Sequence, residues 1–324
     1  MKAAIFTRYG SSEELTVTEC EKTLPKDDEV LIRVHAVSIN DWDWQALNGI
    51  PFVNRLIFGL FKPKRRILGS DVAGRIEAVG KKVHRFKAGD KVYGDLSNYW
   101  GGFAEYVCAR ESSLTGMPDG MTFEQAAAIP QAGALAVQAL IESGRIRNGQ
   151  KILINGAGGG VGTLGIQIAR QYTVEVTGID HTAKIDIMRN MGYDRVIDYT
   201  QTDFTGEHER YDLIIDTKTN RPVLRYLRVL APNGTYVTMG GNLGRVLQIL
   251  LLSPIISRTS GKRVVAVMLK PNRGLTYLNE LFVKGALRPV IDKTFTLDRI
   301  AEAMRYFGEA KHKGKVVVAI AEKE

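Results

Sequence analysis

Five of the seven residues from position 156 to position 162 are glycine. An apolar run at 151–155 precedes this segment, and a run typical of a helix follows it. A loop that approaches a pyrophosphate closely needs glycine, because a Cβ would block positive φ or the ligand itself. Backbone amides at the start of the helix can then bind the phosphates. The segment therefore predicts dinucleotide binding, although Ala157 occupies the place of one glycine in the usual spacing. The candidate contacts are Gly156, Gly159, Gly160, Val161 and Gly162.

The strand after this helix ends in Asp180, roughly 20 residues past the glycine loop, where an acid usually binds the ribose hydroxyls of NAD. Thr182 and Lys184 follow, and a base there could instead receive the 2′-phosphate of NADP. Asp180 or Thr182 could also be a helix N-cap, and that role is compatible with ribose binding. The choice between NADH and NADPH stays open, with Asp180 favouring NADH.

A second polar stretch, "VSINDWDWQ" at 37–45, offers Asn40, Asp41 and Asp43 directly after an apolar run. These residues could ligate a metal, orient a substrate, or form only a polar loop, and the local sequence does not decide. Cys20 and Cys108 form no CxxC pair, so a thiolate zinc site and a disulfide framework are not expected. We interpret both as reduced cysteines of a cytoplasmic protein.

Two patterns of hydrophobic residues along the chain indicate which strands and helices position these residues. Strand-like runs with period two occupy the first hundred residues, as in 29–39, 70–80, 91–96 and 101–109, and predict a small, mostly antiparallel barrel or sandwich. After about residue 120, short apolar strands alternate with amphipathic helices, which predicts a doubly wound parallel sheet. The fold class is therefore α/β. We expect a barrel domain over 1–120, to which 271–324 returns, and a dinucleotide-binding domain over 121–270.

Composition excludes several classes of protein. The chain has 324 residues, is 44% hydrophobic and 24% charged, and is long enough for two buried cores. No secretory signal is recognisable at its start, and the apolar stretch 246–257 is too short to span a membrane. The net charge of +9 indicates no nucleic-acid partner by itself, and "KPKRR" at 62–66 is either a solvated loop or a loop attracted to an anionic surface.

The chain resembles the medium-chain dehydrogenase/reductase superfamily over essentially its full length. The resemblance rests on seven segments: "AVSIND", "GSDVAGRIEAVGKKVHRFKAGDKVYG", "GGFAEYV", "AAAIPQAGALAVQAL", "NGAGGGVGTLGIQIA", "DRVIDY" and "HKGKVVVAI". It implies a GroES-like β-barrel catalytic domain joined to a Rossmann domain. Within the superfamily the chain looks like the zinc-free, quinone oxidoreductase-like branch. Where the zinc branch has a cysteine and a His-Glu pair, this chain has Asn40 and Ser70-Asp71, and we expect His35 and His84 to be surface residues.

The resemblance also implies roles for individual residues. Asn40 and Asp43 would lie closest to the nicotinamide ring as catalytic residues. Trp42 or Trp44 would be an apolar wall of the pocket, or both would only pack between the two domains. Tyr199 would lie near the adenosine phosphate, and Thr217 and Gly240 would line the cofactor cleft. Two departures put single contacts in doubt: Leu135 replaces a cofactor-binding threonine, and "DTKTN" at 216–220 replaces a glycine-bearing turn. The strand 262–270 would pair with its copy in a homodimer.

A zinc-free site lacks the Lewis acid that alcohol oxidation needs, whereas hydride delivery to a conjugated system does not need one. The expected function is therefore NAD(P)H-dependent reduction of a small apolar quinone or α,β-unsaturated carbonyl. Alcohol or aldehyde oxidoreduction is the enzymatic alternative. A non-enzymatic protein with peripheral membrane contact is the other, since the apolar segments 52–61 and 246–257 could line a substrate mouth or touch a membrane.

Overall fold

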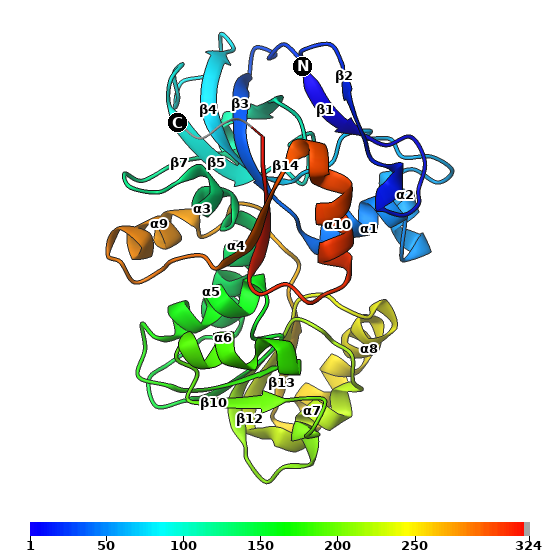
Figure 1. The fold of residues 1–324 in the computed structure, drawn as a ribbon. Coiled ribbons are helices and arrows are strands. Elements are labelled where there is room, and N and C mark those ends of the chain that lie inside the picture. The colour runs from blue at the N-terminus through cyan, green and yellow to red at the C-terminus, as the bar shows by residue number, and fades with distance from the viewer. Residues whose placement is uncertain (321–324) are drawn as a thin grey trace. The chain divides into compact units, whose positions relative to one another are not determined.

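Two units make up the chain in the computed structural model, which describes residues 1–320 (Figure 1). Unit 1 combines Met1–Gln131 with the segment that begins at Leu275, and unit 2 is Ala132–Gly274. The first boundary therefore falls 11 residues after the expected end of the barrel domain at 120. The helix α3 (Phe123–Ala127) accounts for this difference, because it packs on strands of unit 1.

Unit 1 is built mostly on an antiparallel sheet in the order β14-β15-β3-β4-β5-β7, with β6 paired to β3 and a separate β1-β2 hairpin. Its strands are β1 (Lys2–Ile5), β2 (Thr16–Glu19), β3 (Glu29–Ser38), β4 (Asp71–Val79), β5 (Lys91–Asp95), β6 (Tyr106–Arg110), β7 (Thr115–Gly116), β14 (Ile291–Thr296) and β15 (Lys315–Ala319). Its helices are α1 (Asp41–Asn48), α2 (Arg55–Phe58), α3, α9 (Leu275–Val283) and α10 (Ile300–Gly308). A further helix, α4 (Pro130–Val137), begins at the boundary between the units.

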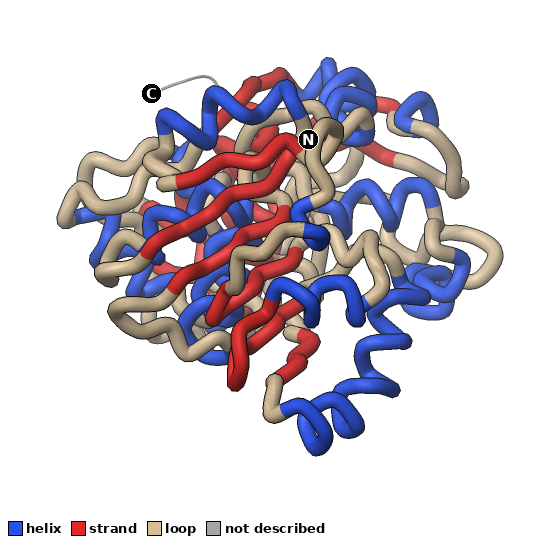
Figure 2. Tube along the Cα trace, turned by 90° about the horizontal axis from the view of Figure 1, so that it is seen from below, coloured by secondary structure: helices blue, strands red, loops and turns tan. Residues whose placement is uncertain are grey.

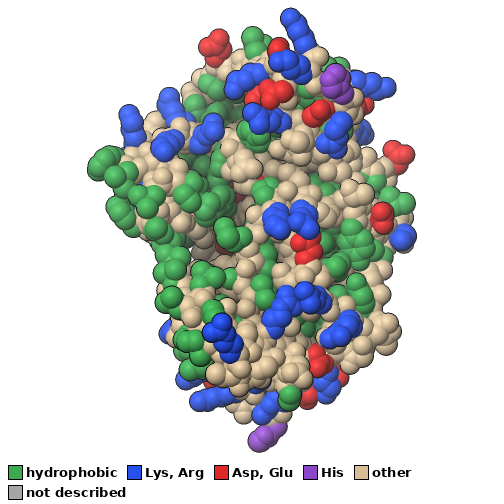
Figure 3. All heavy atoms as spheres, turned by 180° about the vertical axis from the view of Figure 1, so that it is seen from behind, with side chains coloured by type: hydrophobic (Ala, Val, Ile, Leu, Met, Phe, Trp, Pro, Cys, Tyr) green, Lys and Arg blue, Asp and Glu red, His purple; other side chains and the backbone are tan. Residues whose placement is uncertain are grey.

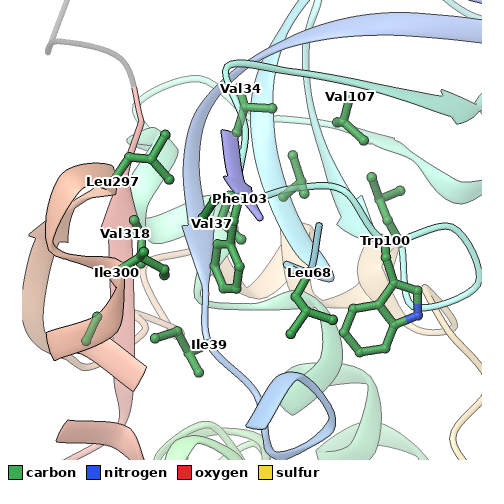
Figure 4. Close-up of a cluster of buried hydrophobic side chains, with 14 of the residues drawn as sticks. Val34, Val37, Ile39, Leu68, Trp100, Phe103, Val107, Leu297, Ile300 and Val318 are labelled. Atoms are coloured by element: carbon green, nitrogen blue, oxygen red, sulfur yellow. The ribbon is translucent and has the colours of Figure 1, made fainter. Parts of the chain in front are cut away.

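The core of unit 1 joins segments that are far apart in the sequence. Leu297, Ile300 and Val318 pack in one cluster with Val37 and Phe103 (Figure 4). The strand pairing explains this arrangement, because β15 lies antiparallel beside β3, with Val318 opposite Val37. The hydrophobic core of unit 1 is therefore formed jointly by the N-terminal strands and by residues near the end of the described chain.

His35 corrects one expectation. The alternation along β3 predicts a solvent-facing His35, but the side chain is buried and its ring stacks on Phe123 with centroids 4.0 Å apart. Helix α3 covers this part of the sheet, so Leu31, His35 and Val37 on the second face of β3 are buried, and Arg33 is exposed. His84 is exposed, as expected.

Unit 2 is a parallel sheet in the order β10-β9-β8-β11-β12-β13, with helices running alongside the strands (Figure 2). The strands are β8 (Lys151–Asn155), β9 (Glu175–Asp180), β10 (Arg195–Asp198), β11 (Tyr211–Asp216), β12 (Leu230–Thr238) and β13 (Arg263–Ala266). The helices are α5 (Gly160–Ala169), α6 (Ile185–Asn190), α7 (Val223–Val229) and α8 (Leu243–Ser260). The predicted fold class, an antiparallel barrel-like unit plus a doubly wound parallel sheet, is confirmed.

The strand order of unit 2 reverses at β8, since the chain passes from β8 outward to β9 and β10 and then returns to β11 on the other side. Ligands of doubly wound sheets bind at the carboxyl ends of the strands at such a reversal. The glycine loop directly follows β8, so the fold places it at this point. Among the described residues, no helix is long and apolar enough to cross a bilayer.

Candidate functional site

The glycine loop contains glycines that the chain itself requires. Gly156 has φ of +89°, and a Cβ there would collide with Thr217 Oγ1. A Cβ at Gly162 would collide with the backbone of Ala157, so this glycine lets α5 pack closely against the loop. These two positions match the tight turn and the close helix packing of a dinucleotide-binding loop.

Gly159 is different, because nothing in the chain forbids a side chain there. Its φ is −89°, and the nearest atom to an added Cβ would be Gly156 O at 3.5 Å. Gly159 is the N-cap of α5, and it makes no side-chain cap for the amides that follow at Gly160 and Val161. All three residues are half-buried. The open space at Gly159, beside the uncapped start of α5, is a cradle that fits a phosphate group and that a side chain would fill.

Asp180 holds the glycine loop from the end of β9. Its carboxylate is only 4% exposed and accepts hydrogen bonds from the Gly158 amide at 2.9 Å and the His181 amide at 2.8 Å. Lys184 Nζ lies 3.9 Å from Asp180 Oδ1, and both side chains are buried. The Asp180 carboxylate therefore faces the glycine loop, and Lys184 is close enough to offset its negative charge.

A second carboxylate adjoins Asp180 and was not singled out from the sequence. Asp198 ends β10 opposite Asp180 in the strand register, and its Oδ2 accepts a 2.5 Å hydrogen bond from Thr182 Oγ1. This hydrogen bond is the main cause that lowers the pKa of Asp198. Thr182 is thus engaged with Asp198. The sequence did offer a signal, because Asp198 ends the strand-like run "RVID" just as Asp180 ends the strand before it.

Tyr199 follows Asp198 and stays close to Asp180. Its amide donates to the Asp180 carbonyl at 3.2 Å, its ring meets His181 edge-on at 6.0 Å, and its side chain is 41% exposed. The Tyr199 ring is therefore an exposed aromatic surface next to Asp180.

Thr217 and Gly240 follow the carboxyl ends of β11 and β12. Thr217 Oγ1 donates to the Asn155 carbonyl at 3.0 Å and so joins the end of β11 to that of β8. The Gly240 carbonyl accepts from Thr219 Oγ1. Sequence reasoning missed Lys218, an exposed residue whose Cε lies 3.2 Å from the point that a Gly156 Cβ would occupy. The unusual "DTKTN" turn was the signal for a cation at the loop.

In unit 1, Asn40 and Asp43 form the start of α1. The Asn40 amide donates to Asp43 Oδ2 at 2.9 Å, and the Gly69 amide donates to Asp43 Oδ1 at 3.0 Å. Ser70 Oγ adds a bond of 3.3 Å to the same carboxylate. Asp43 is fully buried, and burial raises its pKa to about 7 against the opposing effect of these donors. The carboxylate of Asp43 thus joins the start of α1 to Gly69 and Ser70.

Asn40 is tied into the same cluster through its side chain. Its Nδ2 donates to Ser70 Oγ at 3.2 Å, and its Oδ1 accepts from Lys315 Nζ. Lys315 Nζ also donates to the Ile39 carbonyl at 3.3 Å and lies 3.6 Å from Asp71 Oδ2. Sequence reasoning missed Lys315, although it lies within the "HKGKVVVAI" segment that carries the resemblance.

The cluster contains three buried carboxylates and one buried cation. Asp71 accepts from Ser38 Oγ at 3.3 Å and from the Gln131 amide at 3.2 Å, and Asp95 is opposite Asp71 in the register of β4 and β5. Burial raises the pKa of Asp71, with Lys315 acting in the opposite direction. Burial, reinforced by the charge of Asp71, raises the pKa of Asp95 to about 7. Residues 1–320 contain no group of three His, Cys, Asp or Glu side chains suited to a metal ion.

The two tryptophans of "VSINDWDWQ" pack inside unit 1. Trp42 meets Phe58 edge-on with centroids 4.9 Å apart, and the indole of Trp44 lies against Gly308 of α10. Both belong to the rim of the unit 1 core. These contacts of both tryptophans lie within unit 1, whereas the packing alternative places them between the two domains.

Comparison with known proteins agrees with this geometry. Residues 26–119 match the alcohol dehydrogenase GroES-like domain, and residues 191–318 match a family described as zinc-binding dehydrogenase. A 2-methylene-furan-3-one reductase of Solanum lycopersicum is 31% identical over 98% of this chain and 79% of its own length. A chloroplastic quinone oxidoreductase of Triphysaria versicolor is 30% identical over 98% of both chains.

Among solved structures, a quinone oxidoreductase from Coxiella burnetii is similar over 99% of both chains, with 27% identity and a TM-score of 0.87. The sequence relatives, the domain matches and this structural similarity all extend over both units. The chain belongs to the medium-chain dehydrogenase/reductase superfamily, in its quinone oxidoreductase-like branch.

Proposed function

We propose that the protein is an NAD(P)H-dependent reductase that transfers hydride to a quinone or an α,β-unsaturated carbonyl without a metal ion. The observation that carries the cofactor assignment is the open position at Gly159, where the chain leaves room for a phosphate beside the first amides of α5. The substrate class is supported by the names of the relatives, which are quinone oxidoreductases and an enone reductase.

The residues of unit 2 would hold the cofactor, which supplies the hydride when bound. The amides that begin α5 at Gly160, Val161 and Gly162 would receive the pyrophosphate, assisted by the positive end of the helix dipole. Asp180 is held rigidly by two amides and would accept the adenosine ribose hydroxyls. Tyr199 would border the adenosine, and Thr217 and Gly240 would border the nicotinamide side.

The unit 1 cluster would bind the substrate. Lys315, Asp43 and Ser70 fix Asn40 through both its side chain and its backbone, so the start of α1 cannot shift easily. A preorganised polar group of this kind stabilises charge that develops on a substrate oxygen. Asn40 is the residue that we expect to face the substrate oxygen, and Asp43 acts through Asn40.

A screen of substrates tests this function directly. Purified protein is titrated with NADH and NADPH by fluorescence, and cofactor oxidation is then followed with quinones, enones, alcohols and aldehydes. We expect turnover with quinones or enones and none with alcohols. Turnover restricted to alcohols or aldehydes would overturn the substrate assignment, and failure to bind either cofactor would overturn the function as a whole.

Chelation should leave the activity unchanged. The positions that hold zinc in the other branch are Asn40 and Ser70-Asp71 here, and these side chains bind one another and Lys315. We expect the rate of reduction after dialysis against EDTA to equal the untreated rate, with metal analysis finding less than stoichiometric zinc. Loss of activity with EDTA and its recovery with zinc would contradict a metal-free mechanism.

We further propose that NADH is accepted at least as well as NADPH. Asp180 and Asp198 are opposite each other in the register of β9 and β10, so a 2′-phosphate bound there would meet two carboxylates, and Lys184 is already paired with Asp180. Like charges within a few ångströms cost about 1–4 kcal/mol between the aqueous and near-surface limits. Lys184 would therefore have to offset the negative charge of both Asp180 and Asp198 for a 2′-phosphate to bind.

Asp180→Ser is expected to shift the preference toward NADPH by tenfold or more. The substitution removes one carboxylate and releases Lys184, and about 1.4 kcal/mol corresponds to a factor of ten. The measurement is the ratio of kcat/KM for the two cofactors, which is insensitive to any general loosening of the loop. Asp186→Ser is the matched control, because Asp186 is an exposed acid on α6 that pairs with Arg189. An unchanged ratio in Asp180→Ser would mean that Asp180 only anchors the loop.

The assembly that we propose is a homodimer formed through β13, which is the outer strand of the unit 2 sheet. An unpaired strand edge is a site of association, and pairing with a second copy removes it.

A further inference from the structure

The segment that follows α1 carries an unusual concentration of exposed apolar side chains. Residues 50–61, which we call the apolar loop, include α2 and the turns on either side of it. Its exposed fractions range from 41% at Leu60 to 89% at Phe61. The large apolar residues concerned are Ile50, Phe52, Val53, Leu56, Ile57, Leu60 and Phe61. Figure 3 shows hydrophobic side chains gathered at one edge of the molecule with Lys and Arg side chains beside them.

The apolar loop is held in place by contacts on its inner side. Phe58 is buried and packs edge-on against Trp42 at 4.9 Å and Trp100 at 5.9 Å. Tyr9 Oη donates to the Gly59 carbonyl at 2.5 Å, and Arg55 Nε donates to the Gly49 carbonyl at 3.1 Å. Ring packing and hydrogen bonds to backbone carbonyls therefore fix the backbone of the apolar loop, and the outward direction of its apolar side chains follows from that fixed backbone.

The charge around the apolar loop has one sign. Lys62, Lys64, Arg65 and Arg66 follow it directly and are exposed, and Arg55 lies within it. The sequence contains no Asp or Glu from position 44 to position 70. The surface thus combines apolar side chains with five cations and no neighbouring acid in the segment.

We propose that the apolar loop and the basic run 62–66 bind the surface of an anionic lipid bilayer. The apolar side chains would enter the interface between headgroups and acyl chains, and the cations would pair with the headgroups. A second copy of the chain is disfavoured as the occupant, because an interface of the loop with itself would bring two sets of cations together. A small uncharged substrate is also disfavoured as the occupant, because it would make no use of the positive charges at 62–66. This inference goes beyond the proposed reductase function and does not depend on it.

Vesicle co-sedimentation of the full chain tests the proposal. We expect binding to vesicles of phosphatidylcholine with phosphatidylserine, weaker binding to pure phosphatidylcholine, and a decline with salt. Leu56→Ser combined with Phe61→Ser should lower the partition coefficient on the mixed vesicles at least tenfold. Lys64→Glu combined with Arg65→Glu should abolish the preference for the anionic vesicles.

The control is Leu250→Ser combined with Leu251→Ser on α8, which removes two leucines that are 54% and 75% exposed but have no basic run beside them. This variant should bind vesicles as the unaltered chain does, and circular dichroism should show that all the variants are folded. Three results would overturn the proposal: no vesicle binding by the unaltered chain, equal binding by the Leu56/Phe61 variant, or a lower mass of that variant in light scattering. The last result would make the loop a contact between copies.

Discussion

Replacing Gly159 by valine is expected to weaken NAD(P)H binding at least a hundredfold while the protein remains folded. The chain has room for a Cβ at this position and the backbone has a negative φ, so the substitution introduces no strain of its own. The branched side chain would instead fill the space beside the amides of α5 that the pyrophosphate needs. A hundredfold loss corresponds to about 2.7 kcal/mol of binding free energy. Fluorescence titration with both cofactors measures it.

Two other glycines of the same segment are the controls for this experiment. Gly165→Ala places a Cβ in ordinary contact with Ile154 and Leu140, at 3.6 and 3.7 Å, and should leave both the fold and the affinity unchanged. Gly162→Ala should destabilise unit 2, because its Cβ would collide with the Ala157 backbone. A folded Gly159→Val protein with unaltered affinity for NADH and NADPH would show that the loop is not the cofactor site.

Replacing Lys315 by methionine is expected to lower the free energy of unfolding of unit 1 by about 3–5 kcal/mol at neutral pH, the usual cost of removing one member of a buried ion pair. Methionine keeps the length of the side chain but leaves Asp71 and the Asn40 carbonyl oxygen without their cation. The three tryptophans of the chain, Trp42, Trp44 and Trp100, all lie in unit 1. Tryptophan fluorescence during urea unfolding therefore reports on this unit alone.

The loss should shrink as the pH falls. Without Lys315, which opposes the effect of burial, the pKa of Asp71 in the folded state rises further above 3.8, its value in an unfolded chain. The folded variant then binds a proton that the unfolded variant releases, so its stability decreases as the pH rises from about 4 through the folded-state pKa. Asp43 and Asp95, each with a pKa of about 7, also make the folded state less stable as the pH rises. They do so in the variant and in the unaltered protein alike, so their effect on the difference in stability is small.

Two variants separate the buried pair from general effects of the substitution. Asp71→Asn added to Lys315→Met should recover much of the stability, because no buried charge then lacks a partner. Lys311→Met removes a cation that is 71% exposed and should change the stability by no more than about 0.5 kcal/mol. Equal losses in Lys315→Met with and without Asp71→Asn would show that the ion pair does not carry the effect.

Local patterns in the sequence were enough to predict the fold class and the strand–turn–helix geometry of the glycine loop. The turn at Gly156, the close packing at Gly162 and the acid at Asp180 depend on neighbours within one strand–turn–helix–strand unit, where spacing is informative. The parallel sheet could be predicted for the same reason, since each of its strands is a short apolar run followed by a helix.

Contacts over long sequence separations could not be predicted. Lys315 lies 275 residues after Asn40, and only the pairing of β15 with β3 brings them together. The burial of His35 depends on its stacking on Phe123 of α3, and the alternation of residues along β3 gives no information about a helix that covers the strand. Helix α8 continues through Pro254, a residue that usually breaks or kinks a helix, and the carbonyl that loses its partner belongs to Leu250, which is exposed.

The return of the chain from unit 2 to unit 1 has a consequence for synthesis on the ribosome. Domains fold as units while the chain emerges, but the core of unit 1 lacks β14, β15 and α10 until more than 300 residues have been made. Unit 2 is a continuous segment and can fold while the first 131 residues still wait for their partners. During that interval Asp71 and Asp95 have no lysine beside them, and the apolar strands β3 and β4 lack part of their cover. We therefore expect nascent chains stalled before Lys315 to recruit chaperones through the N-terminal third of the sequence, with unit 2 already resistant to protease.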